Sequence, residues 1–213
     1  MEQKITTLKA QKRNPDRVNI YLDGIYAFGV SRIVAAWLQV GQVLDEEKIA
    51  SLKTQDTKEI ALEKALHFIS YRSRSEKEVR QKLTDKGFSD KEIDEVLERL
   101  RSTGLVEDSQ FARNWVEGRS AFRPRSRRLM TMELHQKGVA DEDIKNALAE
   151  TEDDTTLAYQ AAGRYARRLA GLEWDKFRKR LGAYLGRRGF SYGTTAPVVR
   201  RVWLELHSLE SDE

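Results

Sequence analysis

The sequence predicts a mainly α-helical protein: tandem three-helix repeats in an elongated array, preceded by a small N-terminal antiparallel β-hairpin or meander extension. Apolar residues recur at helical spacing from about residue 57 onward. A basic residue followed by glycine returns at residues 86–87, 137–138 and 188–189, an interval of 51 residues. β-Branched and aromatic residues gather instead in residues 4–29, which is typical of strands.

Residues 4–29 predict two or three short antiparallel strands. Val18, Ile20 and Leu22 alternate with residues of the opposite face, which is the period of a half-buried strand. The Asp-Gly pair at residues 23–24 lies between two such runs and predicts a tight hairpin turn.

Helices are predicted for the rest of the chain. Two short ones are expected at residues 31–38 and 45–52, with Gly41 as the break between them. Capping boxes, Ser75 with Glu78 and Ser89 with Glu92, mark two later helix starts. The expected bounds are 58–72, 76–86 and 90–102 in the first repeat, 108–121, 126–137 and 141–150 in the second, and 154–170, 174–188 and 195–208 in the third.

The 51-residue interval also relates apolar positions. Leu83, Leu134 and Leu185 correspond to one another, and so do Val79, Met130 and Leu181. A unit of about 50 residues has a small core and gains stability by packing on its neighbour, which favours an array over a compact bundle of duplicated origin. The expected domains are the β extension with short helices at 1–55 and the three repeats at 56–103, 104–152 and 153–213.

The composition excludes several kinds of chemistry. The chain has no cysteine, so disulfides and thiolate metal sites are impossible. His67, His135 and His207 lack metal-ligand spacing, and no GxxxxGKS/T phosphate-binding loop occurs. We therefore expect no enzymatic activity, no cofactor and no metal. The sequence has neither a secretory leader nor a membrane-spanning apolar run, so we expect a cytoplasmic protein without membrane contact.

The stretch EGRSAFRPRSRRL, residues 117–129, contains five arginines within residues 119–128 and no acid there. Guanidinium groups bind phosphate or carboxylate in a bidentate manner, which suggests contact with an anionic partner. The alternative is a solvated turn in which Arg119 or Arg128 packs its stem on the core. The candidates here are Arg119, Arg123, Arg125, Arg127 and Arg128.

The third repeat is also basic, with eleven Lys or Arg and two acids between residues 158 and 204. This asymmetry is typical of contact with an anionic partner, because the whole chain has a net charge of only +4. The further candidates are Arg164, Arg167, Arg168, Lys179, Arg180, Arg187 and Arg188, with Arg72 and Arg74 at the corresponding turn of the first repeat.

Aromatic residues accompany these cations and could stack on nucleic-acid bases. They are Tyr165, Tyr184, Phe190, Tyr192 and Trp203. Core packing is the favoured interpretation for most of them, because Tyr165 and Tyr184 fall on apolar helical stripes.

Two segments resemble the RecX family of bacterial regulators of the RecA recombinase. They are SEKEVRQKLTDKGFSDKEIDEVLERLRSTGLVEDSQFARNWVEGR and MELHQKGVADEDIKNAL. RVNIYLDGIYAFGV resembles the N-terminal extension that some members carry, and the resemblance is strongest over residues 74–150. Pro124 and Ser126 stand where many relatives carry a glycine, and Ser126 can cap the following helix.

The resemblance implies a specific function. RecX proteins consist of tandem three-helix repeats, bind RecA, lie along the groove of the RecA–DNA filament and restrain filament growth, strand exchange and repressor self-cleavage. By this resemblance we expect a non-enzymatic regulator in DNA repair and the SOS response. Its partners would be RecA, the RecA nucleoprotein filament and, weakly, single- or double-stranded DNA, and it would act as a monomer.

Two other functions are compatible with the residues themselves. A free-standing helical DNA-binding module would explain the basic third repeat, because phosphate neutralisation supplies most non-specific affinity. A structural adaptor that binds proteins through apolar surfaces between repeats is the third hypothesis.

Overall fold

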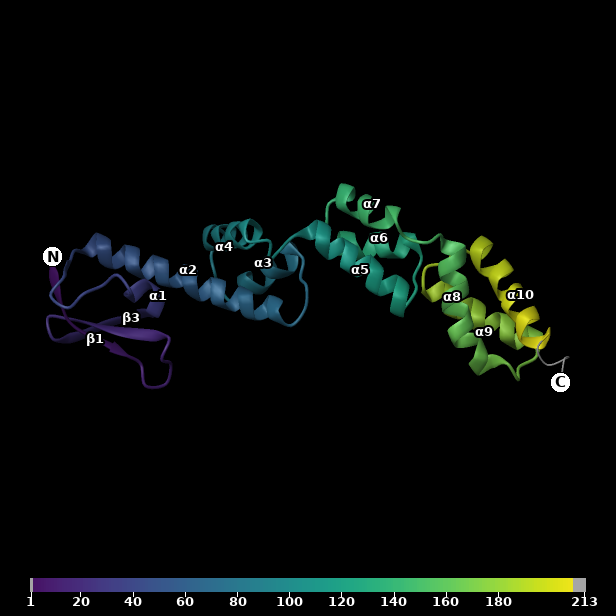
Figure 1. Ribbon diagram of the computed structural model, residues 1–213, viewed down its shortest axis with the longest axis horizontal. Helices are drawn as coiled ribbons and strands as arrows, with labels where there is room; N and C mark the ends of the chain where they lie inside the picture. Colours follow the sequence, from purple (N-terminus) through teal and green to yellow (C-terminus); the bar gives the residue numbers. More distant parts are fainter. Residues whose placement is uncertain (1, 209–213) are drawn as a thin grey trace. The chain divides into compact units, whose positions relative to one another are not determined.

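The computed structural model describes residues 2–208 and divides the chain into two compact units (Figure 1). Unit 1 comprises Met1–Arg74 and Glu78–Val106, and unit 2 comprises Ser75–Lys77 and Glu107–Glu213. The elongated arrangement of the predicted array stays a prediction.

A four-stranded antiparallel sheet opens unit 1, with strand order β3-β2-β1-β4. Its strands are β1 (Gln3–Ala10), β2 (Arg17–Leu22), β3 (Ile25–Ser31) and β4 (Val43–Leu44). Asp23 and Gly24 have φ angles of 50° and 84°, so the predicted hairpin turn is confirmed. Strand β4 was not predicted, because two residues are too few to show a period.

Helix α1 (Arg32–Ala35) is shorter than the predicted helix at 31–38. Ser31 caps its start by accepting a hydrogen bond from the amide of Val34. Apolar side chains of the sheet and of α1, including Ile5 and Ile20, form a buried cluster. This cluster is the core of the β extension.

Helix α2 (Glu46–Ser70) is continuous, so the prediction of separate helices at 45–52 and 58–72 was wrong. No glycine or proline lies between its ends, and its polar middle is held by the sheet. Asp56 is buried, pairs with Arg17 at 2.8 Å and accepts a hydrogen bond from the Ser31 amide. The expected domain boundary at residues 55 and 56 falls within this helix.

The later helices lie close to their predicted places. Ser89 and Glu92 form the predicted capping box at the start of α4. The later helices are α3 (Glu76–Thr84), α4 (Asp90–Ser102), α5 (Asp108–Phe122), α6 (Arg127–Gln136), α7 (Asp141–Ala149), α8 (Asp154–Ala166), the 3₁₀ helix η1 (Arg167–Leu169), α9 (Trp174–Arg187) and α10 (Tyr192–Ser208).

The repeat register is confirmed by burial. Leu83, Leu134 and Leu185 each have 0% exposure, the first in a core of unit 1 and the other two in the core of unit 2. The glycines at residues 87, 138 and 189 all have positive φ angles, between 83° and 88°, which end the second helix of each three-helix segment. The chain is therefore mainly α-helical, with tandem three-helix segments and a small antiparallel sheet.

Candidate arginine-rich binding site

The stretch EGRSAFRPRSRRL forms the end of α5, a short turn and the start of α6 in unit 2. Ser126 caps α6, because its Oγ accepts a hydrogen bond from the Leu129 amide at 3.1 Å. Proline at 124 and serine at 126 therefore make the turn without glycine. Pro124 and Ser126 are buried, so this turn is part of the folded core and not a solvated loop.

Glu133 on α6 is the counter-ion that the local sequence did not reveal. Its carboxylate accepts hydrogen bonds at 2.9 Å from Arg119 Nε and from Trp115 Nε1, and it also forms an ion pair with Arg125. The Arg119 guanidinium lies over the Trp115 ring, 4.4 Å from its centre. Arg119 thus packs against the fold, as the alternative interpretation of this stretch held.

The turn is also bonded to the third three-helix segment. The Ser126 amide donates to the carbonyl of Arg188 at 3.0 Å, and Arg188 Nη1 donates to the Pro124 carbonyl at 3.2 Å. A Cβ at Gly189 would lie 2.5 Å from Ser126 Oγ, so only glycine allows this approach. These contacts lock the turn against the end of α9.

Two further arginines bind helix ends. Arg164 on α8 donates to the carbonyls of Ala121 and Phe122 at 2.8 and 3.0 Å, which satisfies the C-terminus of α5. Arg127 Nη2 donates to the Leu148 carbonyl at the end of α7 at 2.8 Å. Arg119, Arg125, Arg127, Arg164 and Arg188, which we call the turn cluster, are therefore bound within the fold.

The turn cluster is electrostatically crowded. Burial lowers the pKa of Arg119, and burial followed by the charges of Arg119, Arg188 and Arg123 lowers the pKa of Arg125. A guanidinium remains charged at neutral pH despite such a shift. Positive charge therefore accumulates here, and Glu133 balances only part of it.

Other candidates of unit 2 face solvent, and in the described part of the chain they make no ion pair. We call these residues the outer arginines. Among the described residues, the Arg128 side chain forms one hydrogen bond, to the sulfur of Met132 at 3.7 Å. Phe122, 78% exposed, lies between Arg119 and Arg123 in sequence. The outer arginines are Arg123, Arg128, Arg167, Arg168, Arg180 and Arg187, and Lys179 is exposed in the same way.

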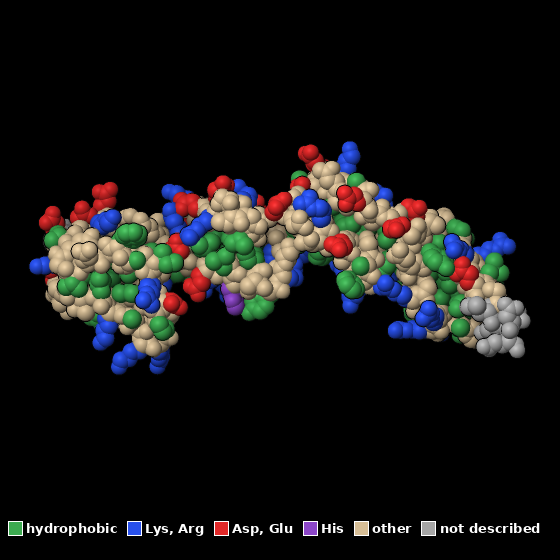
Figure 2. Space-filling view, in the orientation of Figure 1, with side chains coloured by type: hydrophobic (Ala, Val, Ile, Leu, Met, Phe, Trp, Pro, Cys, Tyr) green, Lys and Arg blue, Asp and Glu red, His purple; other side chains and the backbone are tan. Residues whose placement is uncertain are grey.

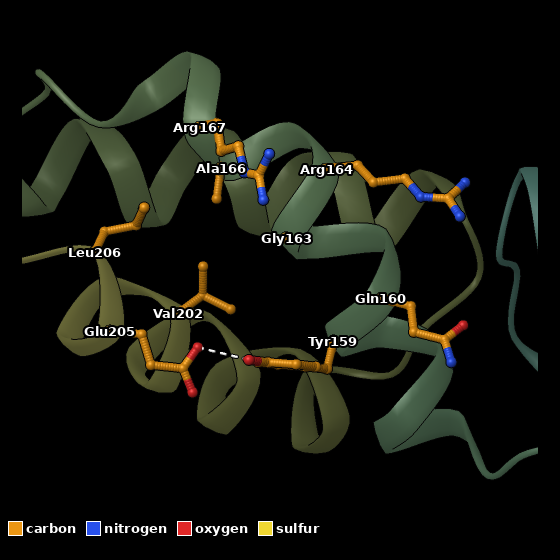
Figure 3. A pocket seen from close by; sticks show the side chains of 9 residues that line it. All are labelled: Tyr159, Gln160, Gly163, Arg164, Ala166, Arg167, Val202, Glu205 and Leu206. Atoms are coloured by element: carbon orange, nitrogen blue, oxygen red, sulfur yellow. Dashed lines mark hydrogen bonds between the residues drawn. The ribbon is translucent and has the colours of Figure 1, made fainter. Parts of the chain in front are cut away.

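Arg164 and Arg167 also line a pocket of 580 Å³ between α8 and α10 (Figure 3). On its other side the Tyr159 hydroxyl donates to Glu205 at 2.7 Å, and Arg201 pairs with the same carboxylate at 2.8 Å. Hydrogen bonds from Arg201 and Tyr159 lower the pKa of Glu205. The pocket is therefore lined by two arginines and by the Glu205 carboxylate, which is already hydrogen-bonded.

Arg72 and Arg74 lie in unit 1. Arg72 is ion-paired with Glu78 at 2.9 Å, and Arg74 lies 4.0 Å from the centre of the Phe68 ring. Burial is the main cause that lowers the pKa of Arg74, and the positive charge of Arg72 lowers it further. These two candidates are therefore engaged locally.

The aromatic candidates for base stacking are mostly core residues. Tyr165 and Tyr184 stack on each other, 4.3 Å between ring centres, and both pack on the unit 2 core. Phe190 is buried, and Trp203 packs against Phe177. Tyr192, at 86% exposure, is different and remains available at the surface.

Charged side chains are unevenly placed on the face of unit 2 that Figure 2 displays. Acidic side chains gather over the upper part of α5 and α7, and basic side chains gather at the lower ends of α8 and α9. Within residues 2–208, no cluster of three His, Asp or Glu could hold a metal ion. No helix within the same residues is long and apolar enough to span a bilayer.

Tandem three-helix segments that carry outward-facing arginines, with a small sheet before them, define a helical-repeat protein with exposed cations on its surface. The family models divide the chain in the same way. The matches are "Regulatory protein RecX N-terminal domain" at residues 3–45 and the first, second and third RecX three-helix domains at 61–100, 108–148 and 152–199.

Curated relatives agree. The chain is 34% identical over 92% of its length to the regulatory protein RecX of Bacillus licheniformis, of which it covers 76%. It is 31% identical over 96% of its length to that of Clostridium acetobutylicum, of which it covers 98%. A solved regulatory protein RecX, 29% identical, superposes over 92% of this chain and 98% of its own with a TM-score of 0.71.

A solved RecX from Lactobacillus salivarius, 22% identical, shares the fold with a TM-score of 0.58 over 70% of this chain and 99% of its own. This chain belongs to the RecX family of regulatory proteins. The resemblance to this family that the sequence showed, strongest over residues 74–150, is confirmed, and the family models also match the N-terminal part and the third three-helix segment.

Proposed function

We propose that this chain binds RecA and the RecA–DNA filament and limits its recombinase, ATPase and co-protease activities in DNA repair and the SOS response. It acts as a monomer in the cytoplasm and catalyses no reaction. Membership of the RecX family supports this proposal. The observation that carries it is the exposed set of outer arginines, because charges that serve no internal contact are free for a partner.

The outer arginines are proposed to make the contact, while the turn cluster holds the turn between α5 and α6 in place within the fold. Arg123 and Arg128 are exposed on the two sides of the turn, and Arg167 and Arg168 are exposed on η1. Phosphate oxygens of DNA and carboxylates of RecA are both suitable acceptors for a guanidinium. Lys179, Arg180 and Arg187 would extend the contact along α9.

The test is RecA's DNA-dependent ATP hydrolysis, measured with increasing amounts of this protein. The variant R123A/R128A/R167A/R168A should inhibit at least about tenfold less effectively, which corresponds to about 1.4 kcal/mol. The control removes four exposed cations of unit 1 that form no ion pair within residues 2–208, Lys9, Lys12, Arg13 and Lys91, and it should inhibit like the parent protein. Equal inhibition by both variants would contradict the proposed contact.

The second candidate is DNA binding without RecA, favoured by the cationic excess of the third segment. Six phosphate contacts would give a log–log salt slope of about −5 on duplex DNA. A slope this steep, combined with no change in RecA's ATP hydrolysis at any concentration, would establish this function in place of the first.

A further inference from the structure

A groove of 730 Å³ lies between α9 and α10, on side chains that the proposed contact does not use except for Lys179. Its floor is formed by small residues, Gly182 and Gly186 of α9 and Ala196 of α10. A Cβ at Gly186 would meet no atom within 4 Å, and one at Gly182 would meet only Thr195 Cγ2, at 3.9 Å. The floor is therefore open backbone that another chain can approach closely.

Thr195 provides an unused polar group in this groove. Its side chain lines the groove, the residue is 7% exposed, and its Oγ1 has no hydrogen-bond partner among the described residues. Buried hydroxyls in folded proteins are nearly always hydrogen-bonded, because an unsatisfied one costs free energy. Because this oxygen is itself enclosed, a ligand in the groove can touch the Thr195 side chain by van der Waals contact but cannot bond to its hydroxyl.

Aromatic and aliphatic side chains form the walls. Phe190 and Val199 are buried at the base, and Tyr192 is 86% exposed at one end. Trp174 stands at the other end and is held edge-on against Trp203, with ring centres 5.4 Å apart. Such walls favour a large apolar side chain as the anchor of a bound segment.

The rim adds a modest positive charge. Lys179 is exposed without an ion pair in the described residues, and Arg178 pairs with Asp175 at 2.9 Å. Two cations and one carboxylate suit a few acidic side chains. The Asp175 carboxylate would repel a continuous run of phosphates, which favours a peptide over a nucleic acid.

We infer that the α9–α10 groove binds an acidic peptide segment that carries a large apolar anchor residue. The anchor lies between Trp174 and Tyr192, and the peptide backbone passes over the two glycines. The acidic side chains of the peptide face Lys179 and Arg178. This inference does not depend on RecA or DNA, and its assay contains neither.

The probe is the fluorescein-labelled peptide EDELLEDE, titrated with the full chain and followed by fluorescence anisotropy. We expect saturable binding, at least tenfold weaker for the peptides EDESSEDE and KKKLLKKK. Absence of saturable binding of EDELLEDE up to about 1 mM protein, or equal binding of all three peptides, would overturn the inference.

Two variants test the location. Gly186→Leu places a side chain in the groove where no atom obstructs it, so it should abolish peptide binding with an unchanged or higher Tm. Gly163→Leu is the matched control: it also meets no atom within 4 Å but lines the pocket of Figure 3, and it should bind like the parent. Equal loss in both variants, or in neither, would contradict the groove as the site.

A (dT)20 oligonucleotide that binds the parent, loses binding in Gly186→Leu and outcompetes the peptide would replace the peptide with a nucleic acid and overturn the inference.

Discussion

The turn cluster and the outer arginines look alike in sequence, yet the structure uses them in opposite ways. Arg125, Arg127 and Arg188 are bonded to Glu133, to a helix-end carbonyl or to the buried turn. Arg167 and Arg180 have no such contacts in the described residues and face solvent. Arginine density alone therefore does not indicate a binding surface. The absence of internal acceptors is the better signal.

The strongest test of the turn as a structural joint is Gly189→Ala. An added Cβ would meet Leu129 Cβ at 2.7 Å and Ser126 Oγ at 2.5 Å, and φ is +88°. We expect a loss of about 2–5 kcal/mol in the free energy of unfolding, from strain and overpacking together, measured by urea denaturation.

The control is Gly87→Ala in unit 1, which has nearly the same φ but no atom within 4 Å of the added Cβ. It should lose only the strain of about 1–2 kcal/mol. Equal losses in both variants would mean that the contact between Gly189 and the turn adds nothing.

Glu133→Ala should have the next largest effect. It leaves Arg119, Arg125 and Trp115 Nε1 without their shared acceptor in a half-buried site. We expect a loss of about 1–3 kcal/mol, smaller than for a fully buried pair because the arginines are partly solvated. Glu142→Ala on α7, an exposed acid without an ion pair in the described residues, should change stability by less than about 0.5 kcal/mol.

A smaller effect concerns pH. Hydrogen bonds from Arg201 and Tyr159 lower the pKa of Glu205, so its folded pKa lies below the unfolded value of about 4.3. Glu205 therefore stabilises the fold above that pH, and the contribution is lost as pH falls through the folded pKa. The stability difference between the parent protein and Glu205→Gln should shrink between about pH 5 and pH 2. A difference that stays constant over this range would contradict the lowered pKa.

The smallest expected effect is the most informative about the outer arginines. The double variant R123A/R128A should change the free energy of unfolding by less than about 0.5 kcal/mol, because neither side chain is ion-paired in the described residues. A Tm scan beside R125A/R127A, which removes two bonded arginines, measures the comparison directly. A larger loss of Tm in R123A/R128A than in R125A/R127A would contradict the conclusion that the outer arginines make no structural contact.

Much of the fold was predictable, because its signals are local or strictly periodic. Leu83, Leu134 and Leu185 share one register, and the glycines that follow them end their helices by positive φ. The continuity of α2 was missed, because the polar residues between 53 and 57 interrupt the apolar stripe. Asp56 is bonded to residues far from it in sequence, and no local pattern announces that bond.

The site was predictable only as a set of residue types. Arg119 lies fourteen residues before Glu133, and the two meet only after α5 and α6 fold back on each other. The signal that could have revealed it is weak: Glu133 is the single acid of α6. The groove beside Thr195 had no signal in the sequence beyond the pair Gly182 and Gly186, a spacing for which close helix packing is the favoured interpretation in a charged helix.

The continuous helix α2 has a mechanical consequence. Its 25 residues extend for about 38 Å without a break, from the β sheet to the first three-helix core. The ion pair between Arg17 of β2 and Asp56 holds the middle of this helix against the sheet. Because one continuous helix joins the two cores of unit 1, a partner that holds the sheet also fixes the direction in which the first three-helix segment points.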